Sequence, residues 1–237
     1  MPKGGKLFLI SGTEDLEVLR NKLEGWSVTE RYMDGDFTID LLEDVSDLEI
    51  ATIGSLQLMG VYSYDYVMRN NHRGRIVHTP ITQDCPFHLG ISDGKLWLLV
   101  LAKKDIANRT AVKVGEICNL DVREASIYSR EMNHYLKIND KTKVVLFTDM
   151  DIPGVDKSAL YGKELVQTSL FKKFVGSGIP KWVVTEDNLK GYTVGIGGDS
   201  SVVIFNTVEN VDYVGYVEDE ILPLVFRTVK LPEQQIL

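Results

Sequence analysis

Runs of alternating apolar and polar residues recur along this chain, and in four places such a run is broken by a dipeptide rich in Gly, Asn or Asp. These residues tolerate the positive φ angles of a two-residue connection, so each break predicts a β-hairpin. The four expected turns are Asp34-Gly35, Asp93-Gly94, Asn139-Asp140 and Gly198-Asp199.

After each hairpin the apolar spacing changes from two to about 3.6, which is typical of an amphipathic helix. Ser46 and Glu49 have the spacing of a capping box for the first of these helices, and Pro223 is expected to stop the last. The four helices are expected over residues 46–56, 106–117, 155–160 and 211–221.

The chain opens with an additional strand and helix. Residues 6–10, a lysine followed by four apolar residues, are expected to form a strand, and Leu16, Leu19 and Leu23 form a helical stripe. Ser11 is expected to cap this helix and Gly25 to close it.

The spacing of the turns suggests an internal duplication. The first and third turns are separated by 105 residues, and so are the second and fourth. We therefore expect an α+β protein of two similar halves, residues 1–118 and 119–237, each a mostly antiparallel sheet of β-hairpin–helix modules covered on one side by helices.

Composition narrows the class of protein. The chain has 237 residues, 44% of them hydrophobic, and a formal net charge of −8, which argues against broad, nonspecific nucleic-acid binding. No apolar run approaches the ~20 residues of a membrane span or resembles a signal peptide. We expect a cytoplasmic protein without membrane contact, whose two cysteines are buried free thiols.

One segment concentrates basic residues, and three tyrosines alternate just before it. Arg guanidinium groups suit anion recognition because they donate paired hydrogen bonds. The predicted ligand-binding residues are Tyr64, Tyr66, Arg69, His72, Arg73 and Arg75. A shift of 105 residues sets this segment beside Lys172, Lys173 and Lys181, which suggests a second basic loop. The alternative is an ordinary solvated connection.

Two further groups of residues have the chemistry of a site. His72, His78, Cys85 and His88 could supply zinc ligands, although no second short-spaced pair of ligands accompanies them. We therefore expect no metal there.

Asp149 and Asp151 follow an apolar run, as Mg²⁺-binding carboxylates often do, and Asp199 is a third candidate. The pair is superficially similar to the aspartate motif of haloacid-dehalogenase-type phosphatases. That family has Gly-Thr where this chain has Ile152-Pro153, so helix capping is the favoured interpretation.

These observations favour a non-enzymatic binding or regulatory protein, without a cofactor. We expect it to recognise an anionic ligand, a local stretch of nucleic acid or a protein partner, or to self-associate. The alternatives are a metal-dependent phosphohydrolase or nuclease built on Asp149 and Asp151, and a structural assembly subunit.

Overall fold

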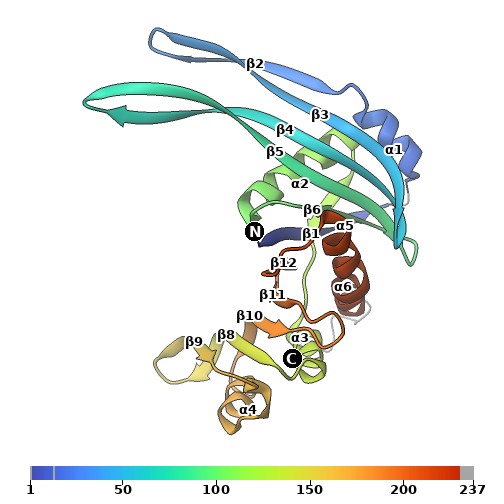
Figure 1. Ribbon diagram of the computed structural model, residues 1–237, viewed down its shortest axis with the longest axis vertical. Helices are drawn as coiled ribbons and strands as arrows, with labels where there is room; N and C mark the ends of the chain where they lie inside the picture. Colours follow the sequence, from blue (N-terminus) through green and yellow to red (C-terminus); the bar gives the residue numbers. More distant parts are fainter. Residues whose placement is uncertain (1, 13, 230–237) are drawn as a thin grey trace. The chain divides into compact units, whose positions relative to one another are not determined.

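The computed structural model describes residues 2–12 and 14–229. Its strands form an open antiparallel sheet of 12 strands in the order β2-β3-β4-β5-β6-β1-β12-β11-β10-β8-β9, with β7 paired to β1 (Figure 1). The predicted α+β class is therefore confirmed. None of the helices in these residues is both long and apolar enough to cross a membrane.

The chain divides into two compact units, which share strand β1 (Lys3–Ser11). One, the hairpin unit, is Phe8–Arg123, and the other, the C-terminal unit, takes the described residues before and after it. The expected division into two α+β halves, residues 1–118 and 119–237, stays a prediction.

The hairpin unit combines long strands with two helices. Its elements are α1 (Leu16–Leu23), β2 (Ser27–Asp34), β3 (Phe37–Ile53), β4 (Ser55–His72), β5 (Arg75–Ser92), β6 (Lys95–Val100), α2 (Lys104–Cys118) and β7 (Asp121–Glu124). The expected helices at 16–23 and 106–117 and the turn at Asp93-Gly94, with φ angles of 51° and 69°, are confirmed. The cap of α1 is Asp15, not Ser11, since its carboxylate accepts from Glu17 N at 2.8 Å.

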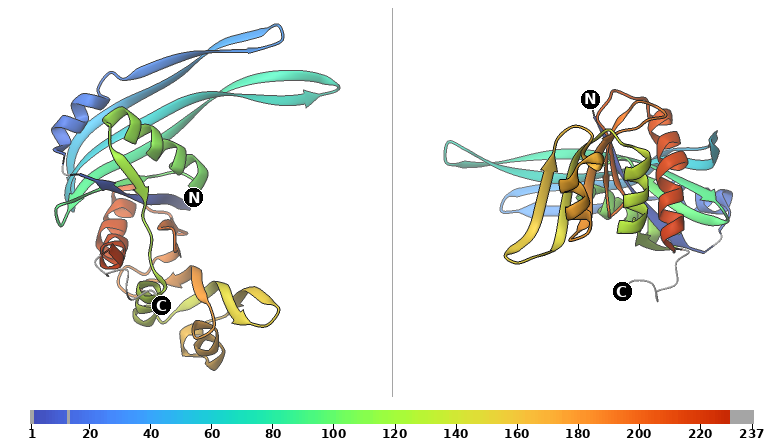
Figure 2. Two further views of the ribbon diagram at one scale, coloured as in Figure 1. Left: turned by 180° about the vertical axis from the view of Figure 1, so that it is seen from behind. Right: turned by 90° about the horizontal axis from the view of Figure 1, so that it is seen from below.

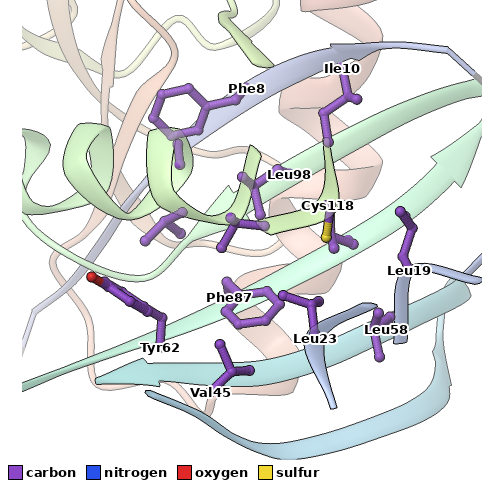
Figure 3. Packing of buried hydrophobic residues seen from close by; sticks show 14 of the residues in the cluster. Phe8, Ile10, Leu19, Leu23, Val45, Leu58, Tyr62, Phe87, Leu98 and Cys118 are labelled. Carbon is purple, nitrogen blue, oxygen red and sulfur yellow. The ribbon is translucent and has the colours of Figure 1, made fainter. Parts of the chain in front are cut away.

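Helices α1 and α2 pack their apolar stripes on one face of the sheet. Leu19 and Leu23 of α1 and Cys118 of α2 meet Leu58 and Phe87 of the strands in one buried cluster (Figure 3). Alternate residues of the strands enter this core, as a half-buried sheet requires.

The helix expected over residues 46–56 is wrong, because this segment lies in β3 and β4. Asp47 has a φ of 53°, and the pairing of β3 with β4 shifts between Ser46 and Glu49. This β-bulge adds one residue to β3, so the next apolar side chain on the core face follows after three residues instead of two. Val45 and Leu48 consequently have the three-residue spacing of a helix.

The C-terminal unit holds the shorter strands. Its elements are α3 (Ser129–Ile138), β8 (Thr142–Ile152), β9 (Val155–Tyr161), the 3₁₀ turn η1 (Leu165–Gln167), α4 (Ser169–Val175), β10 (Ile179–Glu186), β11 (Thr193–Gly197), β12 (Ser201–Ile204), α5 (Asn210–Tyr216), the π-helical turn η2 (Val217–Ile221) and α6 (Leu222–Val229). The expected hairpin at Gly198-Asp199 is confirmed as the β11–β12 turn.

Two expectations for the third module are wrong. The hairpin at Asn139-Asp140 is instead the end of helix α3, whose Met132, Tyr135 and Leu136 are buried at helical spacing. The helix over residues 155–160 is instead strand β9, because Pro153-Gly154 forms the β8–β9 turn. Gly154 has a φ of 78°, as the third residue of a type II turn requires.

The last predicted helix is present, but Pro223 does not stop it. Before the proline the helix widens into the turn η2, where Leu222 N donates to Val217 O. A π-helical turn shifts the hydrogen bonds by one residue, which lets the chain pass a residue without an N–H. The modules thus differ more than their sequences suggested, and the internal duplication is not shown.

Candidate functional site

The outer part of the β4–β5 hairpin, residues 65–83, is largely exposed. β4 and β5 pair without interruption from Gln57–Gly90 to His72–Arg75. The pairing of β3 with β4 begins only at Tyr64, and that of β5 with β6 only at Phe87. This outer hairpin therefore projects from the sheet beside the β2–β3 hairpin (Figures 1 and 2).

Strand alternation sorts the side chains of the outer hairpin onto two faces. Tyr66 lies opposite Ile81 and His72 opposite Arg75, so these pairs share one face. We call it the tyrosine face; its residues are Tyr66, Met68, His72, Arg75, Val77 and Ile81. Asp65, Arg69, His78 and Thr82 lie on the opposite face.

The opposite face is held by the β2–β3 hairpin. Asp34 Oδ2 lies 2.7 Å from His78 Nε2 and 3.0 Å from Arg69 Nε, and the Phe37 ring stacks on His78 with centroids 4.5 Å apart. The hydrogen bond from His78, together with the charge of Arg69, lowers the pKa of Asp34. Arg69 is thus already ion-paired within the protein.

A second contact joins the same two hairpins nearer the sheet. Asp65 accepts a hydrogen bond from Thr82 Oγ1 at 2.6 Å within the outer hairpin. Its other oxygen accepts from Leu42 N of β3 at 3.0 Å. One carboxylate therefore satisfies a backbone group of β3 at the point where the strands β3 and β4 no longer pair.

The tyrosine row runs from the core out onto the tyrosine face. Ring centroids are 5.8 Å apart between Tyr62 and Tyr64 and 6.1 Å apart between Tyr64 and Tyr66. Exposure rises along the row from 0% through 7% to 38%. Arg109 of α2 lies 3.8 Å from the centre of the Tyr64 ring and 3.0 Å from Glu43, which closes the row over Tyr64. Tyr66 stays uncovered beyond it.

The tip carries the basic side chains. Arg73 and Gly74 have φ angles of 52° and 80°, as a type I′ turn requires, and Asn71 Oδ1 accepts from Gly74 N at 2.9 Å. The side chains of His72, Arg73 and Arg75 are exposed, and none has an ion-pair or hydrogen-bond partner among residues 2–12 and 14–229. The charges of Arg73 and Arg75 are available to a partner.

The four candidate zinc ligands are not brought together. Cys85 pairs with Tyr62 and His88 with Met59, so Cys85 and His88 point to opposite faces of β5. Both are buried, and burial raises the pKa of the Cys85 thiol. His72 and His78 lie on opposite faces of the outer hairpin. In the described part of the chain no three His, Cys, Asp or Glu side chains form a metal-binding group.

The three candidate aspartates belong to the C-terminal unit. Asp149 and Asp151 lie in a bulge of strand β8, and Asp199 lies in the β11–β12 turn. Asp149 has a φ of 52° in a bulge of β8 that also includes Asp151, and it accepts from Thr148 Oγ1 at 3.0 Å. Asp199 closes the β11–β12 turn by accepting from Ser201 Oγ at 2.7 Å. Asp149 and Asp151 therefore lie within a strand and do not begin a helix, which corrects the capping interpretation.

The expected second basic loop is also different in structure. Lys172 and Lys173 lie on helix α4 and Lys181 on strand β10, and all three are exposed. Under the shift of 105 residues the outer hairpin therefore falls on a helix and a strand that do not form a hairpin.

Buried polar groups of the C-terminal unit are bonded to one another. Tyr135 and Tyr216 hydroxyls lie 2.9 Å apart, and burial raises the pKa of both. The Tyr216 hydroxyl donates to Asp187 Oδ2 at 3.4 Å, while Asp187 Oδ1 accepts from Lys190 N at 2.6 Å. The network fixes the 187–191 turn against α5.

Sequence reasoning found the tip but missed Met68, Val77 and Ile81. Gly74 follows the alternating tyrosines of residues 62–66 and precedes the β-branched pair Ile76-Val77, and this signal of a hairpin was available. No protein-family model matches the chain, and no curated protein matches it.

Proposed function

We propose that this protein is a non-enzymatic binding protein that docks onto a protein partner through the tyrosine face and tip of its outer hairpin. The proposal is carried by the combination of exposed apolar side chains with the exposed side chains of His72, Arg73 and Arg75, which have no ion-pair or hydrogen-bond partner in the described residues. Aromatic residues, Met and Arg are enriched in protein interfaces because they bury large area and donate several hydrogen bonds.

The charge of the surface indicates an acidic partner. The tyrosine face and the tip carry Arg75 and Arg73 and no aspartate or glutamate, in a chain of net charge −8, whereas Arg69 lies on the opposite face and is ion-paired with Asp34. A partner that presents carboxylates beside apolar side chains would satisfy both parts of the surface. Attraction between opposite patches would also steer the encounter.

The test uses a fluorescently labelled short peptide of alternating glutamate and valine residues, measured by anisotropy at low salt. We expect R73E/R75E to weaken binding by roughly tenfold, about 1.4 kcal/mol, with an unchanged Tm because both side chains are exposed. The matched control is K172E/K173E, which changes the net charge equally on exposed helix α4 and should bind as the wild type does.

Equal peptide binding by R73E/R75E and the wild type would overturn the proposal. Loss of duplex DNA binding in R73E/R75E, without peptide binding by the wild type, would replace the protein partner with nucleic acid. The phosphohydrolase alternative keeps its own test: Mg²⁺- or Mn²⁺-dependent turnover that disappears in D149N.

A further inference from the structure

We infer that the partner is a second copy of this chain, whose β2–β3 hairpin receives the tyrosine face, so that the projecting hairpins of successive copies stack head to tail. The inference rests on the proposed function and names the partner of the same surface.

The two projecting hairpins have two different outward faces. Asp34 and Phe37 contact Arg69 and His78, so one side of the β2–β3 hairpin lies against the outer hairpin. In the β2–β3 register, Arg31 pairs with Asp40 and Thr29 with Leu42, which places their side chains on the other side. We call this the acidic face; its residues are Arg31, Met33, Asp40, Leu42 and Asp44.

The tyrosine face and the acidic face are complementary in charge. Asp40 and Asp44 lie on the acidic face and Asp36 lies in the adjoining turn, with one basic residue, Arg31, which is ion-paired with Asp40 at 2.9 Å. The tyrosine face and the tip carry Arg75 and Arg73 and no carboxylate. Asp36 lies in the turn of the β2–β3 hairpin, as Arg73 does at the tip of the outer hairpin. Opposite charges thus occupy corresponding places on the two hairpins.

Both faces also expose apolar side chains. Met33 is 71% exposed and Leu42 42% exposed on the acidic face, and Met68 is 41% and Val77 44% exposed on the tyrosine face. Each face is a two-stranded ribbon of about eight residue pairs, or about 27 Å in length. Contact between them would bury a few hundred Å² per copy, roughly the size of a weak, transient interface. Association should therefore depend on concentration and salt.

The outer edge of β5 carries a proline. Pro80 stands opposite Val67 in an uninterrupted ladder, so its nitrogen must face away from β4. A proline on the outer edge hinders the addition of another strand. Contact through the faces of the hairpins is therefore favoured over edge-to-edge pairing.

Because the two faces differ, the contact is heterologous, and repeated contacts lead to a ring or an open stack. The test is sedimentation velocity of the full chain over a concentration series at low and high salt. We expect the wild type to associate at low salt, and both R73E/R75E and D36K/D40K to remain monomeric with unchanged Tm.

Mixing the two variants gives the sharpest result. The reversed tip of R73E/R75E is complementary to the reversed acidic face of D36K/D40K, and their unaltered faces also match. We therefore expect association to return on mixing, and in a single chain that carries all four substitutions. A contact of the tyrosine face with itself would not be restored in the chain that carries all four substitutions, because both contacting faces would then be negative.

Two outcomes would overturn the inference: a wild type that stays monomeric at low salt and the highest attainable concentration, or variants that fail to complement one another. In either case, peptide binding that still depends on Arg73 and Arg75 would leave the proposed function standing. If peptide binding is also independent of them, both fail.

Discussion

The ring of His88 is buried, and its Nδ1 lies 3.2 Å from Gln57 Oε1. Gln57 Nε2 donates to Ile53 O at 2.8 Å, so the amide oxygen is the group that faces the histidine. His88 must then donate through Nδ1, which fixes the neutral tautomer. Burial lowers the pKa of His88 to about 4, because the charged ring would lose its hydration.

This burial predicts a pH dependence of stability. The unfolded histidine, with a pKa near 6.5, binds a proton that the folded one refuses until about pH 4, so stability falls as the pH is lowered through this window. We expect His88 to contribute a loss of about 2 kcal/mol between pH 7.5 and pH 5, at 1.36 kcal/mol per pKa unit. Urea unfolding at the two pH values measures it.

The control for this prediction is H88Q, which keeps a polar group near Gln57 but does not titrate. Other titrating groups are common to both proteins, so the difference between their pH dependences isolates His88. Identical pH dependences in the two proteins would contradict the prediction.

Gly90 is a second residue whose environment determines what can replace it. It lies opposite Trp97 in the β5–β6 ladder, and a Cβ on Gly90 would run into the Trp97 ring, which is 1% exposed. We expect G90A to destabilise by about 1–3 kcal/mol, because a buried indole has nowhere to move. Gly215 offers the matched control, since nothing lies within 4 Å of its added Cβ and it sits in helix α5.

G215A should be neutral or stabilising by up to about 1 kcal/mol, as expected for Gly to Ala in a helix. The denaturant midpoints of G90A and G215A, each compared with that of the wild type, measure these changes in stability. A G90A protein as stable as the wild type would show that the indole can be displaced at little cost.

Elements with a constant spacing of apolar residues could be predicted from the sequence. Elements in which that spacing changes could not. α2 shows its buried stripe, Ala107, Ala111 and Val114, directly in the sequence. The β3 bulge at Asp47 imitates helical spacing, and a bulge depends on strand pairing that one segment does not reveal. The end of helix α3 resembled a strand because Leu136 and Ile138 alternate with Lys137, but Ile138 is exposed and the buried residues of the helix have helical spacing.

The contact between the two projecting hairpins makes a prediction at this scale. In D34N the carboxylate that holds Arg69 and His78 is lost, so the β2–β3 hairpin should loosen while Tm stays nearly unchanged, since exposed ion pairs contribute about 0–1 kcal/mol. Hydrogen exchange at Leu42 N, which donates to Asp65, reports the loosening. We expect faster exchange there than in the wild type.

Acid should have the same effect as D34N. The pKa of Asp34 is lowered, so the contact is favoured above the ordinary carboxyl pKa and lost as pH falls through the lowered value. D36N, which removes a carboxylate from the neighbouring turn, is the control and should exchange as the wild type does. Equal exchange at Leu42 in all three proteins would refute the role of Asp34.

For the molecule as a whole, the sequence located the candidate surface but not its arrangement. The arginine-rich stretch marked the tip, yet only the pairing of β4 with β5 separates Arg69 from Arg75. Arg69 meets Asp34, more than thirty positions away in the chain, and no local pattern predicts that ion pair. The apolar half of the surface was hidden for the same reason, because Met68 and Val77 become neighbours of Tyr66 only in the folded hairpin.

The apolar and charged halves of this surface should respond differently to salt. Ionic attraction between exposed groups is screened within about 10 Å at 0.1 M salt, whereas burial of apolar area is not weakened by moderate salt. We expect Y66S/M68S to weaken self-association at every salt concentration while keeping its salt dependence, and R73Q/R75Q, which removes the two charges without reversing them, to abolish that dependence. The exposed Val112 on α2 supplies the control V112S, which should associate as the wild type does. Sedimentation velocity across a salt series measures all three variants, and an unchanged association of Y66S/M68S would remove the tyrosine face from the interface.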